Sequence, residues 1–234
     1  MKKDYKIRAP YFEIGPKCFM WGGRMLKLAR AIDRVAAKYD LDVIVTPQYT
    51  DIRLLAENTE YIHIYAQHMD PLYPGRGLGS VLPEAVKEAG AVGVMLNHAE
   101  KKLTPEVLRQ TIARADEVGL ATIVCADTVE EIRQVALMSP NLIVAEPTDL
   151  IGTGVASDMG YVRDTIEAVR EINSDIMVLQ GAGISTPEDV ARVIRAGALA
   201  TGCTSGVMKA SDPEAAAEEM LWTLRRVWDE VHGA

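Results

Sequence analysis

The sequence predicts an α/β fold, a single (β/α)8 barrel that spans residues 1–234 as one domain. Short apolar runs rich in β-branched residues alternate with longer amphipathic stretches. The runs are nearly continuous, as in parallel strands that are buried on both faces. Eight such units leave about 29 residues for each, close to the minimum for a strand–helix–strand repeat. A doubly wound open sheet is the alternative, disfavoured because no GxGxxG motif follows an early strand.

Eight strands are expected in chain order. The first lies somewhere in residues 6–14, and the weakest is the last, at Ala198–Thr201. The six between them are Asp42–Thr46, Tyr61–Tyr65, Val92–Leu96, Ala121–Cys125, Leu142–Ala145 and Ile176–Leu179.

Helix starts are marked by three pairs in which a capping side chain precedes a proline: Thr104-Pro105, Thr186-Pro187 and Asp212-Pro213. The capping oxygen accepts a hydrogen bond from an otherwise unpaired backbone N–H, and the fixed φ of proline suits the first helical turn. Between Leu26 and Val35, apolar residues recur at helical spacing with charged residues between them, which indicates a further helix.

The composition argues against several classes of protein. A hydrophobic fraction of 48% with 25% charged residues is that of an ordinary globular chain. The net charge of −8 argues against a nucleic-acid partner, and no apolar run has the length of a membrane span. Three widely spaced cysteines favour reduced thiols in a cytoplasmic protein. No HxxxH, CxxC or carboxylate cluster suggests a metal site.

Polar residues that directly follow the apolar runs are the candidates for chemistry, because the active residues of such barrels lie at the carboxyl ends of the strands. His98 follows the fourth run and Glu146 the sixth. At two strand ends of one barrel face they suit proton abstraction next to a carbonyl group, with Glu146 as the base and His98 polarising the oxygen. The plainer interpretations are a structural histidine and an ion-paired glutamate.

Glycine-rich turns follow the seventh and eighth runs, at Gly181–Ile184 and Cys203–Gly206. Backbone N–H groups exposed in such turns form the usual phosphate site of these barrels, although Gly181 and Gly183 also suit a plain tight turn. The segment Gly152-Thr153-Gly154, soon after Glu146, is expected to be a lid that closes over the phosphate.

Taken in order, these segments resemble the triosephosphate isomerase family, and in particular its shorter archaeal branch. The resemblance covers roughly residues 42–216. Its most specific pieces are Ala66-Gln67-His68, residues 82–93, Asn97-His98-Ala99-Glu100, Glu146-Pro147 with residues 150–154, and residues 181–185.

The resemblance implies roles for individual residues. Glu146 matches the catalytic base and His98 the electrophile of the family. The family's phosphate and substrate contacts correspond here to Ile151, Gly152, Gly183, Thr204 and Ser205. The resemblance also implies self-association, as a dimer or tetramer.

The chain departs from the family at its first strand. The family carries an Asn-x-Lys motif there. When the following helix is aligned without gaps, Glu13 takes the position of the asparagine and Gly15 that of the lysine. Only a two-residue shift brings Lys17 onto the lysine position. Lys17 is therefore the candidate for a third catalytic residue that supplies positive charge. An ionised Glu13 repels a dianionic phosphate, which predicts an altered substrate or binding mode.

The expected function is that of an aldose–ketose isomerase for a small phosphorylated sugar, which transfers a proton through an enediolate without a metal or an organic cofactor. The enzymatic alternatives are an isomerase or epimerase for a longer sugar phosphate and a lyase with the same phosphate site. A non-catalytic sugar-phosphate-binding homologue is the alternative from another class. A purely structural barrel leaves Glu146 without a role.

Overall fold

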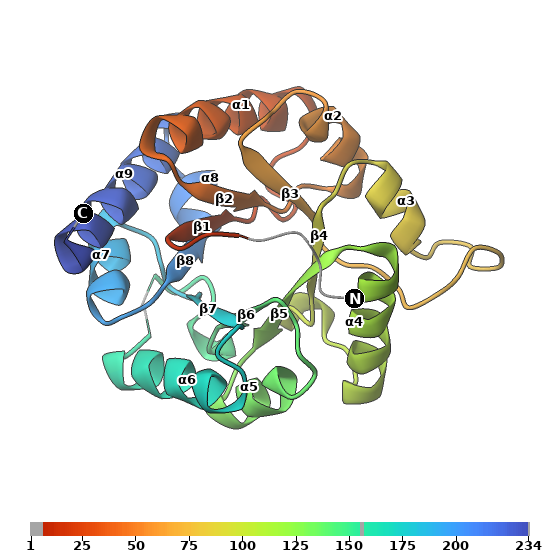
Figure 1. The fold of residues 1–234 in the computed structure, drawn as a ribbon. Helices are drawn as coiled ribbons and strands as arrows, with labels where there is room; N and C mark the ends of the chain where they lie inside the picture. The colour runs from red at the N-terminus through yellow and green to blue at the C-terminus, as the bar shows by residue number, and fades with distance from the viewer. Residues whose placement is uncertain (1–6, 155–156, 234) are drawn as a thin grey trace.

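Eight parallel strands close into a barrel in the order β1 to β8, and β8 pairs with β1. The computed structural model describes residues 7–154 and 157–233. Figure 1 looks along the barrel and shows the helices arranged around it. The predicted (β/α)8 architecture is confirmed.

The strands are β1 (Tyr11–Ile14), β2 (Asp42–Val45), β3 (Ile62–Ala66), β4 (Gly93–Leu96), β5 (Ala121–Ala126), β6 (Leu142–Ala145), β7 (Met177–Gln180) and β8 (Ala200–Cys203). β2 to β7 lie within one residue of the predicted boundaries. β1 lies in its predicted window, whose first residue, Lys6, is outside the described residues. β8 begins two residues later than predicted, because the Ala198 N–H bonds the Val193 carbonyl in the turn after the preceding helix.

The helices are α1 (Gly22–Tyr39), α2 (Ile52–Ala56), α3 (Pro83–Glu88), α4 (Pro105–Val118), α5 (Val129–Ala136), α6 (Met159–Ile172), α7 (Pro187–Arg195), α8 (Ser205–Met208) and α9 (Pro213–His232). Short 3-10 segments lie at Tyr49–Asp51, Ala99–Lys101 and Thr148–Leu150. The three predicted helix starts are confirmed, since Thr104, Thr186 and Asp212 each accept a backbone hydrogen bond as the N-cap.

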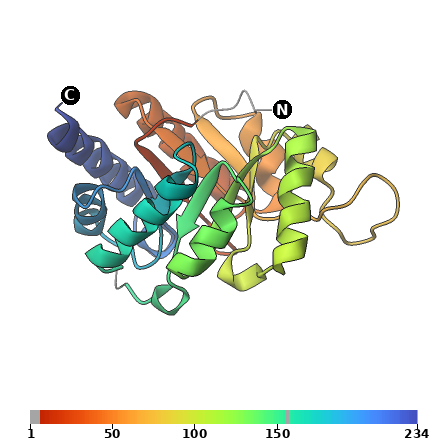
Figure 2. The same ribbon diagram turned by 60° about the horizontal axis from the view of Figure 1, so that its bottom comes forward.

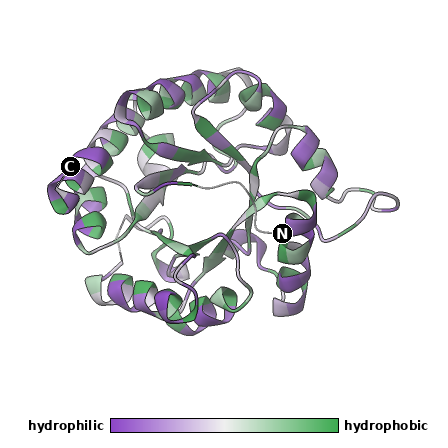
Figure 3. Cartoon of the chain, viewed as in Figure 1, coloured by the Kyte–Doolittle hydropathy of each residue, from purple (hydrophilic) through white to green (hydrophobic). Residues whose placement is uncertain are grey.

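Successive side chains along each strand point to opposite faces of the sheet, and this alternation produces two apolar layers. The barrel interior holds side chains such as Tyr11, Ile44 and Val144. The layer between strands and helices holds the neighbouring residues, for example Phe12 and Val43. Figure 3 shows apolar colour along the strands and polar colour concentrated on the outer helices. The same alternation turns the residues two positions further on, at the carboxyl ends of the strands, toward the barrel mouth.

The connection from β3 to α3 extends beyond the ring of helices, as Figures 1 and 2 both show. Within the residues that the structure describes, none of the helices combines the length and apolarity that crossing a membrane requires.

Candidate active site

His98 and Glu146 meet at the barrel mouth. His98 follows β4 and Glu146 follows β6. The Nε2 atom of His98 lies 3.7 Å from Oε2 of Glu146, and the two side chains are only 16% and 15% exposed. The barrel therefore brings together, at the ends of two strands, two groups that are 48 positions apart in the chain.

The imidazole of His98 is held neutral. Its Nδ1 accepts a hydrogen bond from the Glu100 N–H at 3.1 Å, at the start of the 3-10 segment Ala99–Lys101. The ring proton is thereby assigned to Nε2, the nitrogen that faces Glu146. Burial, together with the ammonium groups of Lys17 and Lys102, lowers the pKa of His98 to about 4. A neutral Nε2–H can donate a hydrogen bond to a substrate oxygen.

Glu146 lies in a confined position against the turn after β7. Burial raises the pKa of Glu146 above its ordinary value, while the Lys17 ammonium and a hydrogen bond from the Ala182 N–H oppose that rise. A Cβ atom on Gly181 would come within 2.9 Å of a Val144 methyl group and 3.3 Å of the Glu146 Cβ. Glycine at position 181 therefore leaves the space in which Glu146 sits, and a carboxylate of raised pKa suits a general base.

Lys17 reaches the mouth from the loop between β1 and α1. Its Nζ lies 2.9 Å from Oε1 of Glu100, and its side chain is 24% exposed. Its backbone has a positive φ of 46°, and its carbonyl accepts hydrogen bonds from the side-chain amides of Gln48 and Gln67. These two amides hold an otherwise unfavourable backbone conformation. The positive charge of Lys17 contributes to lowering the pKa values of both His98 and Glu146.

Glu13 also points into the mouth, in a state that the sequence did not predict. It is 8% exposed, and its Oε1 accepts a hydrogen bond from the Thr46 hydroxyl at 2.8 Å. Burial raises the pKa of Glu13 to about 8. The repulsion expected from Glu13 assumed an ionised carboxylate, whereas near neutral pH most of this group is protonated.

The residues predicted to contact phosphate lie on three turns around the mouth. Gly183 follows Ala182, and both have positive φ values, of 69° and 58°. Thr204 and Ser205 lie where β8 runs into α8.

The turn after β6 carries Ile151 and Gly152. The Ile151 N–H donates to the Thr148 carbonyl at 3.3 Å, so in this conformation it is used within its own turn. Gly152 is exposed with a φ of 74°. A Cβ on Gly154 would lie 3.8 Å from the Ser185 hydroxyl, which places the end of this segment against the turn after β7.

Sequence reasoning missed the polar residues that support the site. Thr46 and Gln67 directly follow the strands β2 and β3, so the strand-end argument could have found both. Tyr161, on α6, donates from its hydroxyl to the Asp127 carbonyl, and the charge of Glu146 contributes to raising its pKa. No sequence signal links Tyr161 to the mouth.

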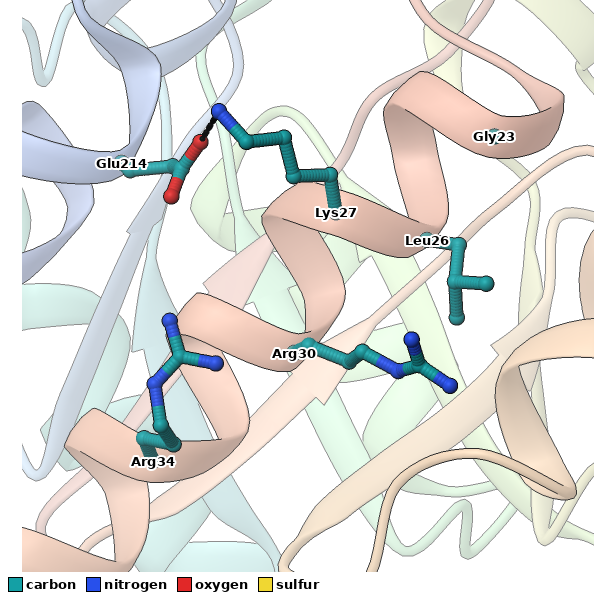
Figure 4. A pocket seen from close by; sticks show the side chains of 6 residues that line it. All are labelled: Gly23, Leu26, Lys27, Arg30, Arg34 and Glu214. Carbon is teal, nitrogen blue, oxygen red and sulfur yellow. Dashed lines mark ion pairs between the residues drawn. The ribbon is translucent and has the colours of Figure 1, made fainter.

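A surface hollow lies away from this site, on the outer side of α1 (Figure 4). Its rim includes an ion pair between Lys27 Nζ and Glu214 Oε1 at 2.6 Å, which joins α1 to α9. Over residues 7–154 and 157–233, no three His, Cys, Asp or Glu side chains gather as a metal site.

A (β/α)8 barrel whose mouth pairs a neutral imidazole with a buried carboxylate, beside an ammonium group, is equipped as an aldose–ketose isomerase. Such an enzyme moves a proton between adjacent carbons. The family model for triosephosphate isomerase matches residues 17–218. The chain belongs to the triosephosphate isomerase family.

Individual relatives agree with this assignment. The triosephosphate isomerase of Methanocaldococcus jannaschii is 38% identical over 203 residues, which cover 86% of this chain and 92% of the relative. That of Sulfurisphaera tokodaii is 37% identical over 219 residues, covering 92% and 95%. The crystal structure of triosephosphate isomerase from Bartonella henselae superimposes with a TM-score of 0.76 at 18% identity, covering 94% of this chain and all of that one, and supports the fold alone. The resemblance to archaeal members is confirmed.

Proposed function

We propose that this enzyme interconverts glyceraldehyde 3-phosphate and dihydroxyacetone phosphate. The observation that carries the proposal is the 3.7 Å separation between Nε2 of a neutral His98 and the carboxylate of Glu146. A proton donor and a base that reach the same two-carbon unit are what an enediolate pathway needs. The two archaeal relatives described above, both triosephosphate isomerases, favour a triose over the longer-sugar, epimerase, lyase and non-catalytic alternatives.

In the proposed reaction Glu146 removes a proton from the carbon next to the carbonyl group. The electron pair of that C–H bond becomes the double bond of an enediolate, whose charge lies on the former carbonyl oxygen. The Nε2–H of His98 donates a hydrogen bond to this oxygen, and the Lys17 ammonium balances the developing charge. The hydroxyl proton on the other oxygen of the enediolate is then transferred to the former carbonyl oxygen, with the His98 imidazole giving one proton and taking up the other. Glu146 returns its proton to the former carbonyl carbon as the new C=O bond forms, so the reaction needs no metal, oxidant or organic cofactor.

The phosphate group is proposed to bind at the turns that carry Gly183, Thr204 and Ser205. Ile151 and Gly152 join these contacts when the turn after β6 closes, because the Ile151 N–H must first leave the Thr148 carbonyl. Such a closure also excludes water from the enediolate.

Cellular context and assembly are also part of the proposal. Cys18, Cys125 and Cys203 are free thiols, which supports a cytoplasmic location. The net charge of −8 argues against a nucleic-acid partner. Self-association as a dimer or tetramer is proposed from the projecting connection between β3 and α3.

The experiment that tests the reaction is an assay with glyceraldehyde 3-phosphate, coupled to reduction of the dihydroxyacetone phosphate formed. Glu146→Gln keeps the size and hydrogen-bonding shape of the side chain but removes the base. We expect kcat to fall by about 10²–10⁴-fold with circular dichroism unchanged.

Glu171→Gln is the matched control, since Glu171 lies on α6 in a surface ion pair with Arg133. It should retain wild-type turnover. A folded Glu146→Gln protein with full activity, or a wild-type protein without activity on trioses, would contradict the proposal.

A further inference from the structure

Glu13 brings a second carboxyl group into the barrel mouth, and the reaction proposed above does not use it. Its side chain points into the barrel like that of Tyr11, two residues earlier on β1. A buried carboxyl group is unfavourable unless its environment compensates. Among the described residues, the Thr46 hydroxyl offsets part of this cost by donating a hydrogen bond to Oε1 of Glu13.

Two glycines make the space that the Glu13 carboxyl occupies. Gly202 on β8 pairs with Glu13. A side chain does not fit at position 202, because a Cβ there would lie 2.6 Å from the Glu13 carbonyl oxygen and 2.9 Å from the Glu13 Cβ. A Cβ on Gly15 would lie 3.0 Å from Oε1 of Glu13 and 3.3 Å from the Thr46 and Thr204 hydroxyls. At the position where the family carries its lysine, a carboxyl and two hydroxyl oxygens therefore converge.

The groups that face Glu13 come from four parts of the barrel. Glu146 after β6 adds to the rise in the pKa of Glu13, and Lys17 from the loop after β1 opposes it. Burial raises the pKa of the Cys125 thiol on β5 and of the Cys203 thiol on β8, that of Cys203 to about 12. The charge of Glu13 contributes to both increases. Both thiols are therefore neutral, and burial dominates the ionisation of Glu13.

We propose that Glu13 is a substrate-binding residue: with Oε1 held by Thr46, its carboxylic acid donates a hydrogen bond from Oε2 to an oxygen of the bound sugar phosphate. Oε2 lies on the Gly202 side of the carboxyl group, 3.2 Å from the position of a Cβ there. The Thr204 hydroxyl converges with the same carboxyl group around Gly15, and Ser205 follows it at the start of α8, so the phosphate end of the ligand is the proposed acceptor. The ligand class rests on the proposed function.

The sign of the pH effect follows from the charge of the ligand. A sugar phosphate is a dianion above its second pKa of about 6. A carboxylic acid donates to this dianion, whereas a carboxylate repels it, so the ligand holds the proton on Glu13. Affinity then falls by only about twofold from about pH 7 to about pH 8, and its fall steepens toward about tenfold per pH unit above about pH 9.

The test measures the dissociation constant of glycerol 3-phosphate by calorimetry between about pH 6.5 and about pH 9.5. This probe carries the phosphate and hydroxyl groups but no carbonyl, so the enzyme cannot turn it over. We expect wild-type affinity to fall about fivefold between about pH 8 and about pH 9. Glu13→Gln cannot ionise and should show no such fall, whereas the surface control Glu171→Gln should behave as the wild type.

Three outcomes would overturn the proposal: a wild-type affinity that is flat across this range, an equal alkaline loss in Glu13→Gln, or no binding at any pH. In the last case turnover of triose phosphates would still support the proposed function.

Should Glu13→Gln fail to fold, carbon-13 NMR of the wild-type protein labelled at the glutamate carboxyl carbons decides the question. The resonance with the high pKa must titrate at still higher pH when glycerol 3-phosphate is bound. An unmoved or lowered titration would overturn the proposal.

Discussion

Burial has the largest effect on the pKa values of His98 and Glu146, and Lys17 is the cation that acts on both. Its ammonium group disfavours the charged imidazolium form of His98 and favours the charged carboxylate form of Glu146, so it lowers both pKa values. Both effects act in the direction that the reaction needs, a neutral donor beside an ionised base.

Replacing Lys17 by Met should therefore impair catalysis in two ways. Loss of the charge next to the developing enediolate should lower kcat/KM by about 10²–10³-fold. Without the cation the pKa of Glu146 rises, so the base is ionised only at higher pH and the acid limb of the kcat/KM profile moves upward. Both changes are measured in one series of coupled assays across the acid range.

Lys38→Met is the control for Lys17→Met, since Lys38 lies on the outer face of the barrel in an ion pair with Glu218. It should leave both the rate and the acid limb unchanged. An acid limb that stays in place in Lys17→Met would mean that this ammonium group does not act on Glu146.

The sequence predicted His98 and Glu146 for a simple reason: both follow continuous apolar strands, and the parallel barrel turns all such ends to one face. The position of Lys17 could not be predicted in this way. Its ammonium group reaches the mouth because a left-handed backbone at Lys17 is clamped by Gln48 and Gln67, which come from two other strand ends. The protonated state of Glu13 likewise depends on burial by the whole barrel.

At the scale of elements, local signals fixed helix starts better than strand ends. A capping oxygen before a proline acts within four residues, so three helix starts followed from the sequence alone. The bounds of β8 depend instead on its neighbours, because Gly202 and Cys203 have little strand preference of their own and pair with Glu13 and Ile14 of β1.

The cap of α7 offers a test that separates stability from binding. Thr186 forms a reciprocal capping box with Asp189 directly after the turn that carries Gly183. Thr186→Ala should lower the free energy of unfolding by about 1 kcal/mol. It should also raise KM for glyceraldehyde 3-phosphate severalfold, because the turn loses its anchor. Chemical denaturation and steady-state kinetics measure the two effects.

Thr128→Ala is the comparison variant, because the Thr128 side chain caps α5 by accepting a hydrogen bond from the Glu131 N–H and no substrate contact is proposed on its turn. It should lose a similar free energy of unfolding and keep its KM. Equal changes in KM for the two variants would contradict a phosphate site at the turn after β7.

At the scale of the whole molecule, closing the barrel pairs every strand on both sides, so the sheet has no free edge for association. A different surface remains, the connection between β3 and α3, here called the projecting loop and defined as residues 70–82. Its tip carries Leu78, which is fully exposed.

The base of the projecting loop is held in place. Asp70 and Val81 are joined by hydrogen bonds in both directions, and Arg114 of α4 donates to the Leu72 carbonyl at 3.1 Å. Arg114 also stacks on the ring of Tyr73, 4.1 Å from its centroid. A protrusion with an anchored base and an apolar tip loses little conformational entropy when a second copy covers it.

We expect the protein to self-associate through the projecting loop. Light scattering of the wild-type protein should report at least twice the chain mass of 25.6 kDa. Leu78→Glu places a charge at the tip, which cannot be buried without a large desolvation cost, so the mass should fall toward that of a single chain. Leu137→Glu is the matched control, because Leu137 is 60% exposed at the end of α5, outside the projecting loop, and should leave the assembly intact. A wild-type mass of one chain would contradict self-association, and an intact assembly in Leu78→Glu would place the interface on another surface of the barrel.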